Sequence, residues 1–306
     1  MKKRIIKSII FLLVPLSLSG QLAPVTSQYV LNPLSINPAF AGNRGALNIA
    51  AFYRNQWTGI PGAPVTLTLA ADAPFLNSKL GLGFVITNDK IGVTKETHVM
   101  TNYSYKINMN AGELSLGLGA GIISTNTIWS DLVVLDQGDQ NMLIDSRAFI
   151  VPDFSFGVYY SSTNYFGGFS IPKLLGYKFD FDKNKYTLFF APKQYNYLIN
   201  FGYAYTLNPK IKLLPSALIS YTPGENLLYD LNLYASLNDR VWGGISYRNK
   251  RSIGGLIQFA INNQIRVAYT YDFDFGQLSH YSNGSHEIML RYEFHYKVEA
   301  VSPLNF

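Results

Sequence analysis

The chain has 306 residues, with 25 Lys and Arg against 19 Asp and Glu, no cysteine, 15% aromatic residues and 14% charged residues. Soluble proteins carry roughly 25% charged residues, so a medium other than water faces much of this surface. A bundle of membrane helices is excluded too, because each span needs about 20 consecutive apolar residues, and the mean hydropathy is only +0.06. The lack of cysteine excludes disulfide frameworks, thiolate zinc sites and cysteine nucleophiles.

Residues 1–20 have the pattern of a secretory signal peptide. Four basic residues precede an apolar core over residues 8–18, and small residues then supply a cleavage point. We expect the mature chain to be exported and to begin near Gln21. Removing the four basic residues leaves 21 Lys and Arg against 19 Asp and Glu, so the net charge falls from +6 to about +2. The basic balance is therefore no evidence for nucleic-acid binding, and we expect no nucleic-acid partner.

From residue 46 onward, apolar residues alternate with small or polar ones in segments of about ten residues, separated by Gly, Asn, Asp and Pro. The clearest example runs from Gln264 to Gly276. A soluble sandwich would put charged and long polar groups on its outer face. Here the less hydrophobic face holds mainly Gly, Ser, Thr, Asn and Ala, which suits the interior of a membrane barrel. We predict an all-β fold, a transmembrane antiparallel β-barrel, in preference to a large secreted sandwich.

Fourteen segments follow this pattern, an even number that places both ends of a bacterial barrel in the periplasm. The predicted strands are 46–56, 64–73, 79–88, 96–108, 112–124, 151–161, 164–171, 194–207, 210–221, 226–238, 240–249, 252–262, 264–275 and 285–296. The even-numbered connections are short and are expected to be periplasmic turns. The longer stretches 125–150 and 172–193 are odd-numbered connections, which puts them on the extracellular side.

The ends of the chain complete the predicted organisation. It consists of a signal peptide (1–20), an N-terminal segment (21–45), the outer-membrane barrel (46–296) and a C-terminal periplasmic tail (297–306). Residues 21–45 contain Asn32-Pro33 and Asn37-Pro38, and proline excludes this stretch from an interior strand. The segment is either a periplasmic tether or a plug inside the lumen, and the existence of a conducting pore depends on which is true.

Seven motifs resemble a known family. They are YVLNPLSINPAFAG (29–42), YRNQWTGIPGAP (53–64), NDKIG (88–92), LLPSALI (213–219), WGGISYR (242–248), YTYDFDFGQL (269–278) and GSHEIMLRYEF (284–294). The first two together are the most specific. On these motifs the sequence resembles the PorP/SprF family of type IX secretion system outer-membrane proteins, and the motifs span nearly the whole mature chain.

This resemblance implies a role that the alternation alone does not. Members are accessory proteins for exporting or displaying large surface proteins, typically adhesins used in gliding motility, which end in a C-terminal sorting domain that the family member recognises. The resemblance thus implies a non-enzymatic protein without a cofactor. Its expected partners are outer-membrane lipid, an adhesin with a sorting domain, and a periplasmic, peptidoglycan-linked component of the secretion system. The alternative is a 14-stranded channel or a transporter of hydrophobic substrates.

Charged residues recur in the polar phase of the predicted strands, where they would face the lumen. They are Arg54, Asp72, Asp230, Arg248, Arg266, Asp272, Asp274, Arg291 and Glu293. Buried charges must be paired, so cross-lumen ion pairs are the favoured interpretation over a transport path. The candidate partner-binding residues are Arg54, Gln56, Trp57, Arg248 and Asp272. The first three open toward the first extracellular loop and could grip the sorting domain of a client.

Other chemistry has weaker support. Ser285 and His286 could suggest a hydrolase, but adjacent strand residues point to opposite faces, so we expect no enzyme. His98, His280 and His295 lack metal-ligand spacing and are interpreted as loop or interfacial residues. The loop 131–145 carries Asp131, Asp136, Asp139, Asn141 and Asp145. It lacks the ligand order of an EF-hand, so an acidic solvated loop is favoured over a calcium site.

Overall fold

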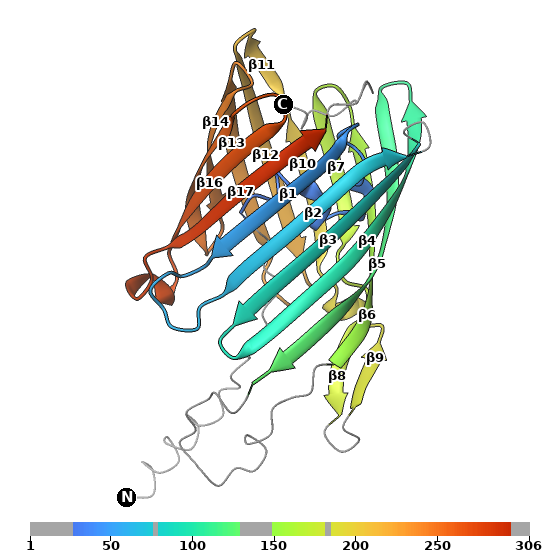
Figure 1. The fold of residues 1–306 in the computed structure, drawn as a ribbon, viewed down its shortest axis with the longest axis vertical. Helices are drawn as coiled ribbons and strands as arrows, with labels where there is room; N and C mark the ends of the chain where they lie inside the picture. The colour runs from blue at the N-terminus through green and yellow to red at the C-terminus, as the bar shows by residue number, and fades with distance from the viewer. Residues whose placement is uncertain (1–26, 76–78, 129–148, 181–184, 295–306) are drawn as a thin grey trace, which may run out of the picture.

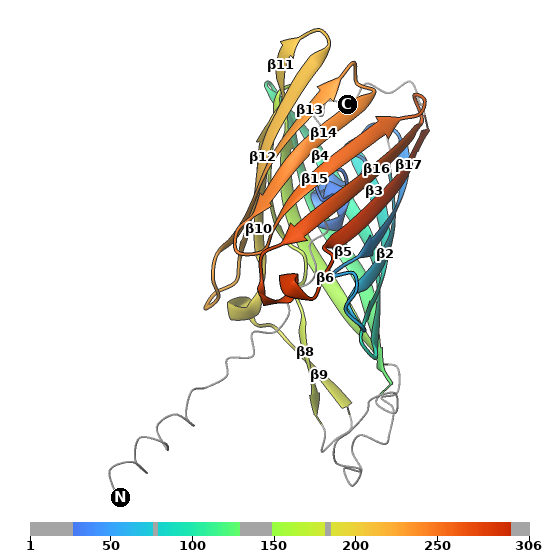
Figure 2. The ribbon, with the colours of Figure 1, turned by 90° about the vertical axis from the view of Figure 1, so that its left-hand side faces the viewer.

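A computed structural model describes residues 27–75, 79–128, 149–180 and 185–294. These residues form a closed antiparallel β-barrel with strongly tilted strands (Figures 1 and 2). The predicted signal peptide, the tail 297–306 and the acidic loop 131–145 lie outside the described residues. Among the described residues, no helix is long and apolar enough to cross a membrane.

The barrel strands match the predicted segments closely. They are β1 (Leu47–Asn55), β2 (Val65–Phe75), β3 (Leu80–Ile91), β4 (Thr94–Met109), β5 (Gly112–Thr127), β6 (Phe149–Ser161), β7 (Tyr165–Ile171), β10 (Tyr197–Tyr203), β11 (Tyr205–Asn208), β12 (Ile211–Tyr221), β13 (Leu228–Leu237), β14 (Val241–Arg248), β15 (Ser252–Ala260), β16 (Ile265–Asp274) and β17 (Ser285–Phe294). β10 and β11 are one predicted strand interrupted at Ala204, and both pair with β12. The barrel therefore has fourteen strands, and it closes where β1 pairs with β17.

Alternation along each strand separates a lipid face from a lumenal face. In β15 the odd-numbered Ile253, Ile257 and Phe259 are exposed, while Ser252 and Gln258 point inward and are buried. Every backbone donor and acceptor in a bilayer must be satisfied within the protein, and closure leaves no open sheet edge in the hydrocarbon region. The apolar residues that look exposed on this barrel are thus the surface that lipid covers.

The sequence did not predict β8 (Gly176–Asp180) and β9 (Lys185–Phe189). They form a separate two-stranded sheet within the connection expected to be a loop, 172–193. Each has five residues, about half of the 9–11 that a membrane-spanning strand requires. A search for spanning strands misses them because of this length. In Figure 1 the β8–β9 hairpin extends from the lower end of the barrel.

The two ends of the barrel differ in their connections. One end, here called the long-loop end, carries the β1–β2 loop, the β8–β9 hairpin and the β16–β17 connection with its 3-10 turn η6 (Gln277–His280). The opposite end, here called the short-turn end, joins neighbouring strands by brief turns such as residues 110–111 and 238–240. In Figure 1 the long-loop end points downward. The distribution of short and long connections agrees with the sequence prediction.

The N-terminal segment lies inside the barrel. Residues 27–46, here called the plug, include the 3-10 turns η1 (Pro33–Ser35) and η2 (Pro38–Phe40), and all except Leu31 and Ser35 are buried. Figure 2 shows the plug in blue between the barrel walls. The sequence left a tether and a lumenal plug open for this segment. In the structure, its described part occupies the lumen.

Candidate functional site

Glycines in the barrel wall make room for the plug. A Cβ on Gly117 of β5 would lie 2.1 Å from the Ala39 amide nitrogen, and one on Gly81 of β3 would lie 1.9 Å from the Ala41 carbonyl oxygen. Real Cβ atoms do not approach other atoms so closely. Glycine permits close approach of two backbones because it has no side chain. The wall and the plug are therefore fitted to each other at the level of the backbone.

Asn37 anchors the plug to β6 and β7. Its Nδ2 donates to the carbonyl oxygens of Val158, at 3.0 Å, and Phe169, at 3.4 Å, while its Oδ1 accepts from the Ala39 amide at 2.9 Å. The residue is fully buried, and a Cβ on Gly157 would lie 2.0 Å from Oδ1. One side chain thus caps η2 and binds two wall strands.

Replacing Asn37 with alanine is expected to loosen the plug. The change removes the two wall hydrogen bonds and leaves the Ala39 amide without its acceptor, which costs about 1–3 kcal/mol in a buried site. Exchange of the amide hydrogens in residues 33–41 should accelerate by roughly 10- to 100-fold, as measured by mass spectrometry of the purified barrel. Asn263→Ala, in an exposed turn, is the matched control. Equal protection in both variants would show that Asn37 does not hold the plug.

Near the short-turn end, the wall binds the plug through polar side chains. Asp72 accepts from the Gly42 amide and from Asn48 Nδ2, both at 3.0 Å. Lys106 Nζ donates to the Gly42 carbonyl oxygen at 2.7 Å. Arg291 donates to the carbonyl oxygen of Leu31. Backbone groups that have no strand partner are thereby satisfied away from water, as buried polar groups must be.

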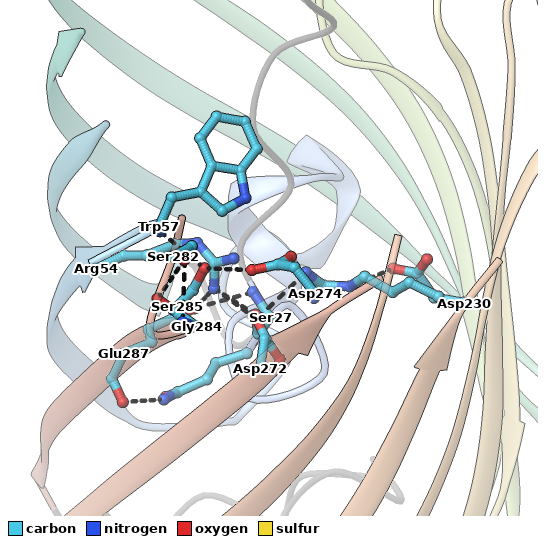
Figure 3. A network of polar contacts seen from close by, with 12 residues as sticks. Ser27, Arg54, Trp57, Asp230, Asp272, Asp274, Ser282, Gly284, Ser285 and Glu287 are labelled. Atoms are coloured by element: carbon cyan, nitrogen blue, oxygen red, sulfur yellow. Dashed lines mark hydrogen bonds and ion pairs between the residues drawn. The ribbon is translucent and has the colours of Figure 1, made fainter. Parts of the chain in front are cut away.

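A second polar layer lies nearer the long-loop end, and Figure 3 shows it. Arg54 Nη1 lies 3.0 Å from Asp272 Oδ2 and 2.9 Å from Glu287 Oε2, and both carboxylates are almost fully buried. The Ser27 amide donates to Glu287 Oε2 at 2.9 Å, and the Ser27 hydroxyl donates to Asp272. The start of the plug therefore joins β1, β16 and β17 in one network.

Arg248 extends this network across the lumen. Its Nε lies 3.2 Å from Asp230 Oδ2 and its Nη1 lies 3.6 Å from Asp272 Oδ2. Tyr29 of the plug accepts a hydrogen bond from Asn232 Nδ2 at 2.5 Å, and burial raises the pKa of the Tyr29 phenol well above its ordinary value, which keeps it neutral. The predicted cross-lumen ion pairs are present for these residues.

The structure brings together three of the five candidate partner-binding residues. Arg54, Arg248 and Asp272 meet in the buried network, whereas Gln56 and Trp57 are half-buried in the β1–β2 loop. The Trp57 amide donates to Ser285 Oγ at 3.1 Å, with Trp57 in the left-handed region at φ 51°. A role in partner binding stays a prediction for all five.

Strand β17 contains Ser285 and His286, the two residues on which the hydrolase interpretation depends. Ser285 is buried on the lumenal side and its hydroxyl donates to Asp274 Oδ2 at 3.3 Å. His286 lies on the other face, where Nδ1 is 2.6 Å from the hydroxyl of Tyr269. The two residues do not converge, as the strand geometry predicted.

A cavity of about 530 Å³ lies between the plug and the β8–β9 hairpin, toward the long-loop end. Its lining includes His98 on β4, whose Nε2 is 3.2 Å from Oδ2 of the buried Asp153 on β6. The interpretation of His98 as a loop or interfacial residue is wrong. It shares its inward phase with Asn102 and Ser104 of the same strand, and that phase is the signal by which the sequence could have placed it. Within the described residues, no group of three or more His, Cys, Asp or Glu could hold a metal ion.

Comparison with known proteins identifies the family of this chain. The model of the type IX secretion system membrane protein PorP/SprF matches residues 18–292. The chain belongs to this family. No curated protein matches it. The family match and the barrel together place this PorP/SprF protein in the outer membrane.

Solved structures similar to this PorP/SprF protein are outer-membrane barrels. The CymD monoaromatic hydrocarbon channel has a TM-score of 0.52 and 11% identity, with 89% of this chain and 94% of that chain covered. The P. putida toluene transporter TodX has a TM-score of 0.47 and 10% identity, covering 87% and 94%. Acinetobacter baumannii Omp33 has a TM-score of 0.47 and 10% identity, covering 81% and 98%. At this identity, the likeness to CymD establishes the fold alone.

Proposed function

We propose that this PorP/SprF protein is a non-enzymatic accessory of the type IX secretion system that supports secretion and surface attachment of a large adhesin. It does so by binding the C-terminal sorting domain of the adhesin. The observation that carries the proposal, beside the family, is the plug. Residues 27–46 fill the lumen between two polar layers, whereas a diffusion channel needs a continuous open path. A closed barrel with an elaborated mouth suits a binding platform.

The two ends would meet different partners. The long-loop end, with the β8–β9 hairpin and the β1–β2 loop, would face the cell exterior and hold the sorting domain. The short-turn end would face the periplasm, where a peptidoglycan-linked component of the secretion system would bind. This orientation follows from the rule that outer-membrane barrels have short periplasmic turns and longer extracellular loops.

The alternative is a channel or a transporter of hydrophobic substrates, since CymD, which has a similar fold, is a monoaromatic hydrocarbon channel. The shared fold is compatible with either function. Steady single-channel conductance of the purified barrel, together with the absence of any copurifying adhesin, would favour the alternative.

The test is purification of the tagged protein from its own cells in mild detergent, with mass spectrometry of what accompanies it. We expect a very large protein with a type IX sorting domain in near-stoichiometric amount. Replacing residues 176–189 with a Gly-Ser linker should abolish this association. The barrel should stay intact, because the hairpin is a separate sheet whose Gly176 and Phe189 are paired neighbours.

A control variant changes the short-turn end of the barrel instead of the long-loop end. Lys210→Glu, in the exposed β11–β12 turn, should leave adhesin recovery unchanged. Recovery of the barrel alone, from cells that express candidate adhesins, would contradict tight client binding. Equal loss of the adhesin in both variants would contradict the assignment of the client to the long-loop end.

A further inference from the structure

The cavity beneath the β8–β9 hairpin has two opposed carboxylates that pair with no cation among the described residues. Asp89 of β3 and Glu96 of β4 are directly paired across the two strands and both line the cavity. Like charges directly opposite each other destabilise a sheet. Within the described part of the chain, neither carboxylate forms an ion pair, and the only basic residues in the lining are Lys173 and His98. Lys173 instead lies over the ring of Tyr177.

Each of these carboxylates has one oxygen held by the protein. Asp89 Oδ1 accepts from Thr66 Oγ1 at 2.6 Å. Glu96 Oε2 accepts from Thr125 Oγ1 and from the Tyr177 hydroxyl, both at 3.2 Å. The second oxygen of each carboxylate accepts no hydrogen bond from the described residues. The pair is therefore fixed in position with acceptor capacity left over.

Deeper in the cavity, polar side chains also lack partners. Asn102 is 4% exposed and Ser155 is 5% exposed, and neither side chain makes a hydrogen bond within the described residues. A Cβ on Gly119 would lie 2.0 Å from Ser155 Oγ and 2.9 Å from Asn102 Oδ1, so the two side chains converge over that glycine. Buried polar groups are normally paired. Two unpaired ones that line a cavity point to a ligand with hydrogen-bonding groups.

The remaining lining is apolar. Leu34 and Ile36 of the plug, Val85 and Met100 of the wall, and Leu175 beside the hairpin line the same space. A small hydrated cation gains nothing from such surface. An aliphatic chain that ends in a charged group matches both parts, because its stem can lie on apolar atoms while its head reaches carboxylates.

We propose that this cavity binds a guanidinium or ammonium group on an aliphatic stem, presented as an arginine or lysine side chain of an extended polypeptide. Asp89 and Glu96 bind the cationic head, and Asn102 and Ser155 bind polar groups that enter more deeply. This inference rests on the proposed function, since the polypeptide would be a segment of the exported client. It gives that client a chemical requirement, a basic residue seated between the plug and the hairpin.

Titration calorimetry of the full-length protein in detergent tests the proposal. The probes are N-acetyl-arginine amide, its neutral isostere N-acetyl-citrulline amide, and the peptides acetyl-Gly-Gly-Arg-Gly-Gly-amide and acetyl-Gly-Gly-citrulline-Gly-Gly-amide. We expect each arginine probe to bind at least about tenfold more tightly than its citrulline counterpart, the margin of one charge-assisted hydrogen bond. Tighter binding of the arginine peptide than of the free amide supports a polypeptide ligand. Equal binding of the arginine peptide and of N-acetyl-arginine amide would overturn a polypeptide ligand in favour of a free organic cation.

The variant Asp89→Asn/Glu96→Gln should lose the preference for arginine. It relieves like-charge repulsion, so the barrel should fold, which a heat-dependent shift on gel electrophoresis verifies. Asp239→Asn, at the short-turn end beside Lys212, is the matched control and should bind as the unchanged protein does. Asn102→Leu gives an independent variant that keeps both carboxylates and should also weaken binding. Unchanged arginine preference in the double variant overturns the proposal.

Arginine binding and adhesin recovery are separate measurements, so this inference and the proposed function can fail independently. If the double variant loses arginine binding and adhesin recovery together, the cavity holds the client. If arginine does not bind but the adhesin copurifies, this inference is wrong and the platform function stands. If arginine binds with the expected preference but no adhesin copurifies from expressing cells, the platform function is wrong, and a polypeptide ligand from that client is excluded with it.

Discussion

Arg54→Met is expected to lower the free energy of unfolding of the barrel by about 3–5 kcal/mol, the usual cost of removing one partner from a buried ion pair. Arg54 is the cation nearest to both Asp272 and Glu287, at 3.0 Å and 2.9 Å. These carboxylates are 1% and 0% exposed, so water cannot replace the guanidinium. The measurement is urea unfolding in lipid vesicles, followed by tryptophan fluorescence.

Two further variants distinguish lost pairing from lost packing. Lys212→Met removes a cation that faces the partly exposed Asp239 at 3.0 Å and should cost less than about 1 kcal/mol, as is typical of surface pairs. Arg54→Met/Glu287→Gln removes one charge of each sign from the buried network and should recover part of the loss. A single Arg54 variant as stable as the Lys212 variant would mean that the network does not stabilise the barrel.

The barrel could be predicted because lipid imposes a simple rule on every spanning strand. Side chains alternate between lipid and lumen for about ten residues, and the predicted segment 264–275 became β16 with that alternation. The short β8–β9 hairpin falls outside the rule, since it does not span the membrane. The interruption at Ala204, which splits one predicted strand into β10 and β11, is local: β10 keeps the alternation, whereas all four residues of β11 are exposed.

The site was predicted only in part, because sequence gives the face of a side chain but not its depth in the barrel. Arg54, Arg248 and Asp272 were all assigned to the lumen, yet nothing in the sequence says that strands β1, β14 and β16 bring them to one level. The location of the plug was equally inaccessible. Its 3-10 turns have three residues each and no period that could be detected.

The role of the glycines in the barrel wall could not be predicted from the sequence either. The small residues on the lumenal face of β5 include Gly117 and Gly119, and either could have been alanine or serine in a water-filled lumen. Only the plug explains why Gly117 has no side chain, because the Ala39 backbone occupies the space that a Cβ would need. A glycine that faces a docked segment is a contact residue, although its sequence context looks like that of any small lumenal residue.

Gly117→Leu is expected to convert the closed barrel into one that conducts ions. Its Cβ would lie 2.1 Å from the Ala39 amide nitrogen, and β5 is hydrogen-bonded to β4 and β6 along its length, so the plug is the part that can move. Single-channel recording in planar bilayers should give no steady conductance for the unchanged protein and discrete openings for Gly117→Leu. Amide exchange of residues 33–41 should rise in parallel.

Gly255→Leu is the matched control, because Gly255 is an exposed strand glycine with no atom within 4 Å of its would-be Cβ. It should remain closed. Openings in both variants would mean that leucine perturbs the barrel wherever it is introduced. Steady conductance of the unchanged protein would mean that residues 27–46 do not seal the lumen, which would remove the main structural argument for a platform over a channel. A closed wild type with an open Gly117→Leu variant would instead make the plug the element that separates those two functions.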